Sequence, residues 1–130
     1  MILSPEYENK FLDLIRGFPI AAITDLYVGL VKIDGTEVVS PSYARVHLIA
    51  SPNVWLSTQG TVAEVSTGAT GEISNVANIS WGEALDTWGT VNKIRFYTDI
   101  SSTAYFCDHA VLESTITNGT VVEVIAGDFV

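Results

Sequence analysis

The residues best suited to hold a metal ion are Cys107, Asp108 and His109, which are adjacent in the chain, together with the distant His47. Thiolate, carboxylate and imidazole groups are the usual protein ligands of zinc. Neighbouring side chains on a β-strand point to opposite faces, so Cys107 and His109 can share a side while Asp108 cannot. No second pair at a zinc-like spacing supplies the remaining ligands. We therefore expect no metal site and no cofactor.

Catalytic groups are equally hard to assemble from this sequence. A nucleophile would need Cys107 or a serine activated by histidine, yet the chain has neither a nucleophile elbow nor a cysteine-protease context. Glycoside hydrolysis needs two facing carboxylates, and four acidic residues fall in or near expected loops: Glu64, Glu72, Glu83 and Asp86. Because any acidic protein offers such pairs, we expect no enzyme.

Three tryptophans, Trp55, Trp81 and Trp88, are the strongest candidates for contacts with a ligand or partner. Tryptophan packs in cores, anchors protein interfaces and stacks on sugars. We favour core packing, then a subunit interface, then binding of a host glycan. Trp55 stands between apolar neighbours, whereas Trp81 and Trp88 lie in the glycine-containing stretch 80–90, which we expect to be a long loop.

Size and composition indicate one folded β domain over residues 1–130. Apolar residues make up 48% of the chain and charged residues only 16%, while Val, Ile and Thr account for roughly a third of it. The net charge of -9 comes from scattered acidic residues, and no basic stripe opposes them. Direct nucleic-acid binding is therefore not expected. A lone cysteine forms no internal disulfide.

The amino terminus lacks the basic and apolar pattern of a secretory leader, and no apolar stretch has the length needed to cross a bilayer. We therefore expect synthesis in the cytoplasm and no membrane insertion.

Residues 4–17 carry the clearest helix signal. Ser4 suits the N-cap, Pro5 the first turn and Gly17 the end. An apolar face with helical spacing is formed by Tyr7, Phe11, Leu14 and Ile15. This face must pack either on the sheet or on a neighbouring subunit, and we favour the sheet.

From residue 20 onward the apolar pattern has a period of two, which predicts strands. The expected strands are 23–33, 42–50, 54–57, 61–66, 76–81, 91–98, 103–112 and 120–126. In the second of these, we expect Ala44, Val46 and Leu48 to face the core, with Tyr43 and Arg45 on the opposite side. Short strands without helical crossovers indicate an antiparallel β-sandwich or jelly-roll-like barrel with one short amino-terminal helix.

Tyr43 and Arg45 are candidate interaction residues because they share one side of their strand. An arginine in this position pairs with a carboxylate either inside the subunit or across an interface, and we favour the internal pair.

Several short motifs follow the helix in a distinctive order. They are Tyr27-Val28-Gly29-Leu30, Gly35-Thr36-Glu37-Val38, Tyr43-Ala44-Arg45-Val46, Ser74-Asn75 before Ile79, Trp88-Gly89-Thr90-Val91 and Asn118-Gly119-Thr120-Val121. In this order, over nearly the whole chain, they resemble a family of small bacteriophage virion proteins commonly labelled tail-fibre or minor structural proteins. The chain departs from the family pattern at 99–102, where the expected glycine-rich turn has no glycine.

The resemblance implies a virion structural protein without catalysis, made in the host cytoplasm, in a tail fibre or baseplate or as a capsid decoration. Its partners would be copies of itself and other virion proteins, and the usual symmetry of fibres and capsid lattices suggests a trimer. The alternative is a host-surface carbohydrate-binding adhesin module. The surfaces expected to meet a partner are the amino-terminal helix, the Ser66–Ser74 loop and the Trp81–Trp88 loop.

Overall fold

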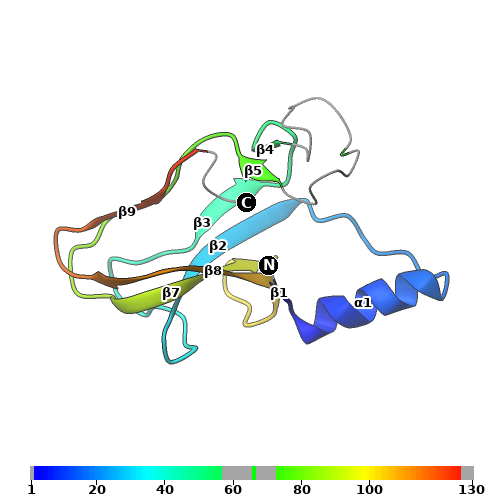
Figure 1. Ribbon diagram of the computed structural model, residues 1–130, viewed down its shortest axis with the longest axis horizontal. Coiled ribbons are helices and arrows are strands. Elements are labelled where there is room, and N and C mark those ends of the chain that lie inside the picture. Colours follow the sequence, from blue (N-terminus) through cyan, green and yellow to red (C-terminus); the bar gives the residue numbers. More distant parts are fainter. Residues whose placement is uncertain (1, 57–65, 67–72, 127–130) are drawn as a thin grey trace.

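The computed structural model describes residues 2–56, 66 and 73–126, which form antiparallel sheets and a single helix (Figure 1). A five-stranded sheet has the order β1-β8-β7-β2-β3. Its strands are β1 (Ile2–Leu3), β2 (Asp25–Lys32), β3 (Val46–Ile49), β7 (Gly89–Tyr97) and β8 (Tyr105–Ile116). Two short ladders pair β4 (Trp55–Leu56) with β5 (Ser74–Asn75) and β6 (Ile79–Glu83) with β9 (Val121–Val124). The mainly β, antiparallel prediction is confirmed.

The core lies between the five-stranded sheet and the β6–β9 ladder. Val28 of β2 stands opposite Phe96 of β7, and Leu30 stands opposite Ile94, so these four side chains share one face of the sheet and are buried. Trp81 of β6 and Val122 and Val124 of β9 pack against this face. The Trp81 indole Nε1–H donates to the Val28 carbonyl at 3.2 Å. The result is a two-layered, sandwich-like arrangement.

Helix α1 (Pro5–Ile15) begins and ends at the residues that the sequence indicates. The Ser4 side chain accepts a hydrogen bond from the Tyr7 amide, and Pro5 occupies the first helical position. At the other end Gly17 has a φ of +91°, and the amide of Phe18 donates to the Asp13 carbonyl at 3.0 Å. This is a Schellman ending, which requires the left-handed backbone that glycine adopts without strain.

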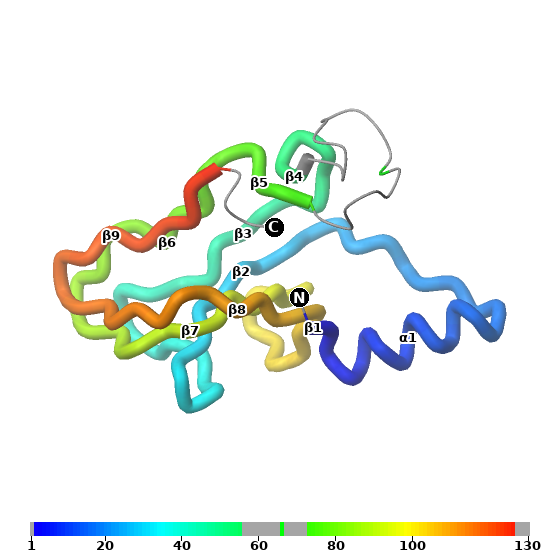
Figure 2. The backbone as a smooth tube through the Cα atoms, viewed as in Figure 1, coloured from blue at the N-terminus to red at the C-terminus, as the bar shows by residue number. Residues whose placement is uncertain are grey.

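Helix α1 projects from one end of the sheets (Figure 2). Its first turn is anchored there, because the Ser4 amide donates to the Phe106 carbonyl at 2.9 Å and the Tyr7 ring meets the Phe106 ring edge-on at 4.7 Å. Over the described residues, no helix has the length and apolar character required to span a membrane.

The expected loop at 80–90 is wrong in most of its length. Strand β6 runs through Glu83 and strand β7 begins at Gly89, so the connection between them is only five residues long. Gly82 suggested a turn, but its positive φ of +78° serves a bulge where β6 shifts register against β9. Trp81 therefore lies on a strand.

Strand β3 is shorter than the predicted 42–50 strand. The predicted alternation of core-facing and outward-facing side chains does not extend back to Tyr43. Ala44 is exposed rather than in the core, whereas Tyr43 and Arg45 are turned inward. Val46 and Leu48 do pack against the core as expected. The predicted 61–66 strand and most of the Ser66–Ser74 loop lie outside the described residues.

Candidate functional site

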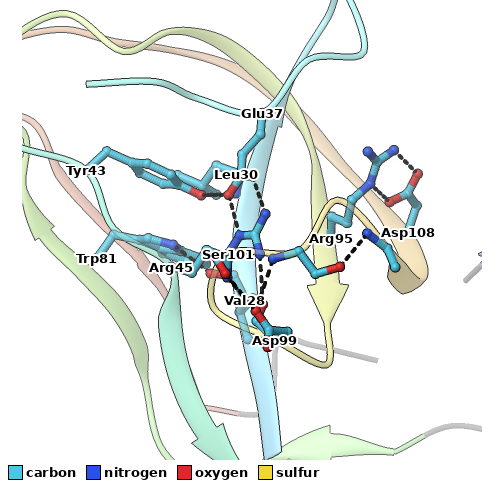
Figure 3. A network of polar contacts seen from close by, with 12 residues as sticks. Val28, Leu30, Glu37, Tyr43, Arg45, Trp81, Arg95, Asp99, Ser101 and Asp108 are labelled. Carbon is cyan, nitrogen blue, oxygen red and sulfur yellow. Dashed lines mark hydrogen bonds and ion pairs between the residues drawn. The ribbon is translucent and has the colours of Figure 1, made fainter. Parts of the chain in front are cut away.

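The two candidate residues Tyr43 and Arg45 meet on the carboxylate of Glu37 (Figure 3). Arg45 Nε and Nη2 donate to the two oxygens of Glu37 at 2.8 and 2.7 Å, and the Tyr43 hydroxyl donates to the same carboxylate at 2.9 Å. The guanidinium carbon lies 3.3 Å from the centre of the Tyr97 ring. We call Glu37, Tyr43, Arg45 and Tyr97 the Arg45 cluster. Arg45 is thus paired inside the chain, as the sequence favoured.

The Arg45 cluster joins three segments of the backbone. The Tyr43 hydroxyl also accepts from the Leu30 amide of β2 at 2.9 Å, and Arg45 Nη1 donates to the Asp99 carbonyl at 2.8 Å. Bidentate arginine–carboxylate pairs fix both partners in orientation. The segment after β2 is thereby held against the sheet and against the 99–102 loop.

Gly29 lies directly beneath the cluster. A Cβ atom at this position would lie 2.8 Å from Glu37 Oε1 and from Tyr97 Cε2, and 3.0 Å from the Tyr43 hydroxyl. Such contacts are shorter than van der Waals separation allows, so only glycine leaves room for the cluster to approach the strand.

Burial and hydrogen bonding set the charges of the cluster. Burial opposes the charge of Glu37, but the hydrogen bonds from Arg45 and Tyr43 outweigh it and hold the pKa of this carboxyl below its usual value. The bonds to Glu37 raise the pKa of Arg45, and burial raises the pKa of Tyr97 to about 12. The cluster is therefore an ionised pair beside neutral phenols at neutral pH.

The 99–102 loop closes without glycine through its own aspartate. The Asp99 carboxylate accepts from the amides of Ser101 and Ser102 at 2.8 and 3.1 Å, which is an Asx-type turn. These bonds from Ser101 and Ser102 lower the pKa of Asp99. The Asp99 side chain thus closes the turn for which the family pattern has glycine residues.

A second ion pair lies across β7 and β8. Arg95 Nε and Nη2 donate to the Asp108 carboxylate at 2.6 and 2.8 Å (Figure 3). The Arg95 guanidinium also covers the Tyr105 ring at 3.9 Å. Asp108 is therefore occupied by an arginine. Cys107 lies on the opposite, core-facing side, where burial raises its pKa to about 12.

The structure does not bring the candidate metal ligands together. His47 stacks on Tyr27 and bonds to Asp25 at 2.7 Å on the far side of the sheet from Cys107. Throughout residues 2–56, 66 and 73–126, no three His, Cys, Asp or Glu side chains are grouped to hold a metal ion.

Of the three candidate tryptophans, Trp81 and Trp88 are part of the packing. Trp88 is only 3% exposed, and its indole Nε1–H donates to Ser42 Oγ at 2.9 Å and to Asp86. Asp86 also accepts from Ser40 and Ser42, so this carboxylate ties the 84–88 connection to the 39–42 segment. Trp81 is half-buried with its N–H bonded to Val28. Glu64 and Glu72 lie outside the described residues.

On helix α1, in contrast to the packed tryptophans, large apolar side chains are exposed. The α1 apolar arc comprises four side chains that are 48%, 60%, 49% and 85% exposed, namely Phe11, Leu12, Leu14 and Ile15. By contrast, Lys10 and Asp13 line a groove of about 460 Å³ between the helix and the returning segment 18–25. The helix thus turns Lys10 and Asp13 toward its own chain and leaves the four residues of the α1 apolar arc in solvent.

Sequence reasoning missed Glu37 and Gly29. The signal was present, since the motifs Gly35-Thr36-Glu37-Val38 and Tyr43-Ala44-Arg45-Val46 each hold one half of the ion pair, and Gly29 stands in a third. Nothing in their spacing shows that they meet.

Comparison with known proteins identifies the family of the chain. A search of curated proteins found no match. The sequence model of a family described as "Podophage GP4 fiber I protein gp80" matches residues 3–130. Because the match covers almost the entire chain, this protein belongs to the podophage GP4 fiber I protein gp80 family.

Proposed function

We propose that the chain is a structural component of a phage fibre, which acts by associating with copies of itself and by docking on other virion proteins. Membership in a fibre family supports a structural role in the particle. The observation that carries self-association is the α1 apolar arc, because contiguous apolar surface on a projecting helix marks a contact site.

The family description also bears on the position in the particle. A fibre protein belongs to the tail fibre or to its attachment on the baseplate, and we prefer this position to capsid decoration. Fibre symmetry suggests a trimer, which would need a contact between copies other than α1, because one self-complementary surface per chain pairs copies two at a time. We propose a structural rather than a catalytic role, which membership in a fibre family supports.

Labelling of particles tests the proposal. Antibody raised against the purified chain, conjugated to gold, should decorate the fibres of purified phage in electron micrographs, and protein mass spectrometry should detect the chain in those particles. Decoration of the head alone would refute the fibre position. Absence of the chain from purified particles would refute the structural role altogether.

A host glycan is the alternative partner, and a glycan array with the purified chain addresses it. Binding that is lost in Trp81→Ala, with the fold and the oligomeric state retained, would favour an adhesin. Trp88→Ala is unsuitable as a partner variant because this buried ring supports the core.

A further inference from the structure

Two residues of α1 and its C-cap residue form a stripe along one side of the helix. Glu8, Leu12 and Arg16 are four residues apart, and this spacing places side chains above one another on a helix. Phe11 and Ile15 lie beside the stripe, on one side of it, within the α1 apolar arc. An acidic end, an apolar centre and a basic end therefore follow one another along the exposed side.

We propose that two copies of the chain pair through α1 in antiparallel orientation, about a two-fold axis at Leu12. The inference rests on the self-association proposed above and names its surface. Around such an axis, each Glu8 lies level with Arg16 of the other copy, and the two apolar arcs cover each other. The interface is isologous, because each copy contributes the same surface.

Charge complementarity points to a second copy of the chain as the partner that covers the α1 apolar arc. The antiparallel arrangement places opposite charges together at both ends, whereas a parallel arrangement places Glu8 beside Glu8 and Arg16 beside Arg16. Among the ion pairs of residues 2–56, 66 and 73–126, Glu6 pairs with Lys10 at 2.7 Å, but Glu8 has no partner. Glu8 is thus available for a basic group from outside.

Arg16 can turn to that partner at little cost. It pairs with Asp13 at 2.6 Å, but both side chains are about half exposed or more, and exposed ion pairs contribute little to stability. The 11-residue helix is about 16 Å long, so the buried area is at the low end for specific interfaces. We therefore expect a dissociation constant on the order of micromolar.

A charge exchange tests the pairing on the full chain. Sedimentation velocity at about 1 to 200 µM, which brackets the expected constant, should show a monomer–dimer equilibrium. Glu8→Lys and Arg16→Glu should each raise the dissociation constant about fivefold or more. The double variant keeps the net charge of the parent and should return to within about twofold of its affinity.

A substitution of Leu12, at the centre of the proposed interface, can be compared with a matched control. Leu12→Gln should shift the chain to monomer, whereas Leu85→Gln, at a leucine of similar exposure outside the helix, should leave the equilibrium unchanged. Circular dichroism of each variant checks that the helix is retained.

Two results would overturn the pairing. One is a double variant that associates no more tightly than the single variants, and the other is a parent chain that stays monomeric over the whole range. Neither result alters the labelling of particles, so the fibre position and the helix pairing are tested independently of each other.

Discussion

At the scale of single residues, the close approach at Gly29 is the most sensitive point of the Arg45 cluster. Gly29→Ala would push a methyl group into Glu37, Tyr97 and Tyr43, so we expect a loss of about 1 to 3 kcal/mol in the free energy of unfolding. Urea denaturation measures it. Ala110→Val, which enlarges an exposed strand residue, should change stability far less. An equal cost for both variants would show that crowding at Gly29 is not the cause.

Glu37 gives the cluster a dependence on pH. Its pKa in the folded chain lies below the ordinary value of 4.5, so its contribution to stability is complete above that pH and is lost as pH falls through the lower folded-state pKa. Glu37→Gln should therefore destabilise the chain at pH 7 and do so less at an acidic pH below 4.5. Denaturation at both pH values tests this. Exposed Glu113→Gln serves as the control, and a penalty for Glu37→Gln that is the same at both pH values would contradict the expectation.

The residue types of the Arg45 cluster could be predicted from the sequence only in part. An internal carboxylate partner for Arg45 could be predicted because a guanidinium pairs readily with carboxylates. The choice of Glu37 does not follow, because it depends on the path of residues 33–44 over the edge of β2, which no local pattern encodes.

At the scale of elements, α1 depends on its first turn for attachment. Tyr7→Ala removes the ring that meets Phe106, and we expect it to cost about 3 kcal/mol. Ile15→Ala on the same helix should change stability by about 0.5 kcal/mol or less, measured at concentrations where the chain is monomeric, because Ile15 is exposed. If the two substitutions cost the same, the helix is held along its length rather than at one end.

Most of the helix and strand positions could be predicted from the sequence. Ser4, Pro5 and Gly17 bound α1 by chemistry that acts within a few residues, and the apolar patterns along 25–32 and 91–97 indicate strands, although residues 28–31 are buried on both faces of the sheet. The misassigned loop at 80–90 arose because Gly82 and Gly89 resemble turn residues. In the structure one accommodates a bulge and the other begins a strand.

At the scale of the whole molecule, Trp81 links the two layers over the core. Trp81→Ala should cost about 3 kcal/mol, and Trp81→Phe, which keeps an aromatic ring but loses the bond to Val28, about 1 kcal/mol. If residues 1–130 are one domain, as the length predicts, both variants should unfold in a single transition by fluorescence and by circular dichroism. Separate transitions for the two probes would show that the layers fold independently.

The order of strands could not be predicted at this scale. Ile2 pairs with Asp108, and β6 pairs with β9, although long stretches of chain separate these partners. Such pairing is selected by the fit of whole faces over the core, which requires the positions of all strands at once.

The burial of Cys107 makes the chain convenient for covalent labelling. With its pKa raised to about 12, this thiol is almost entirely protonated and enclosed at neutral pH, so maleimide dyes should react with it only after unfolding. A cysteine introduced at the exposed Leu112 would then be the one reactive thiol in the native protein. Individual particles carrying that dye would reveal how many copies each one contains.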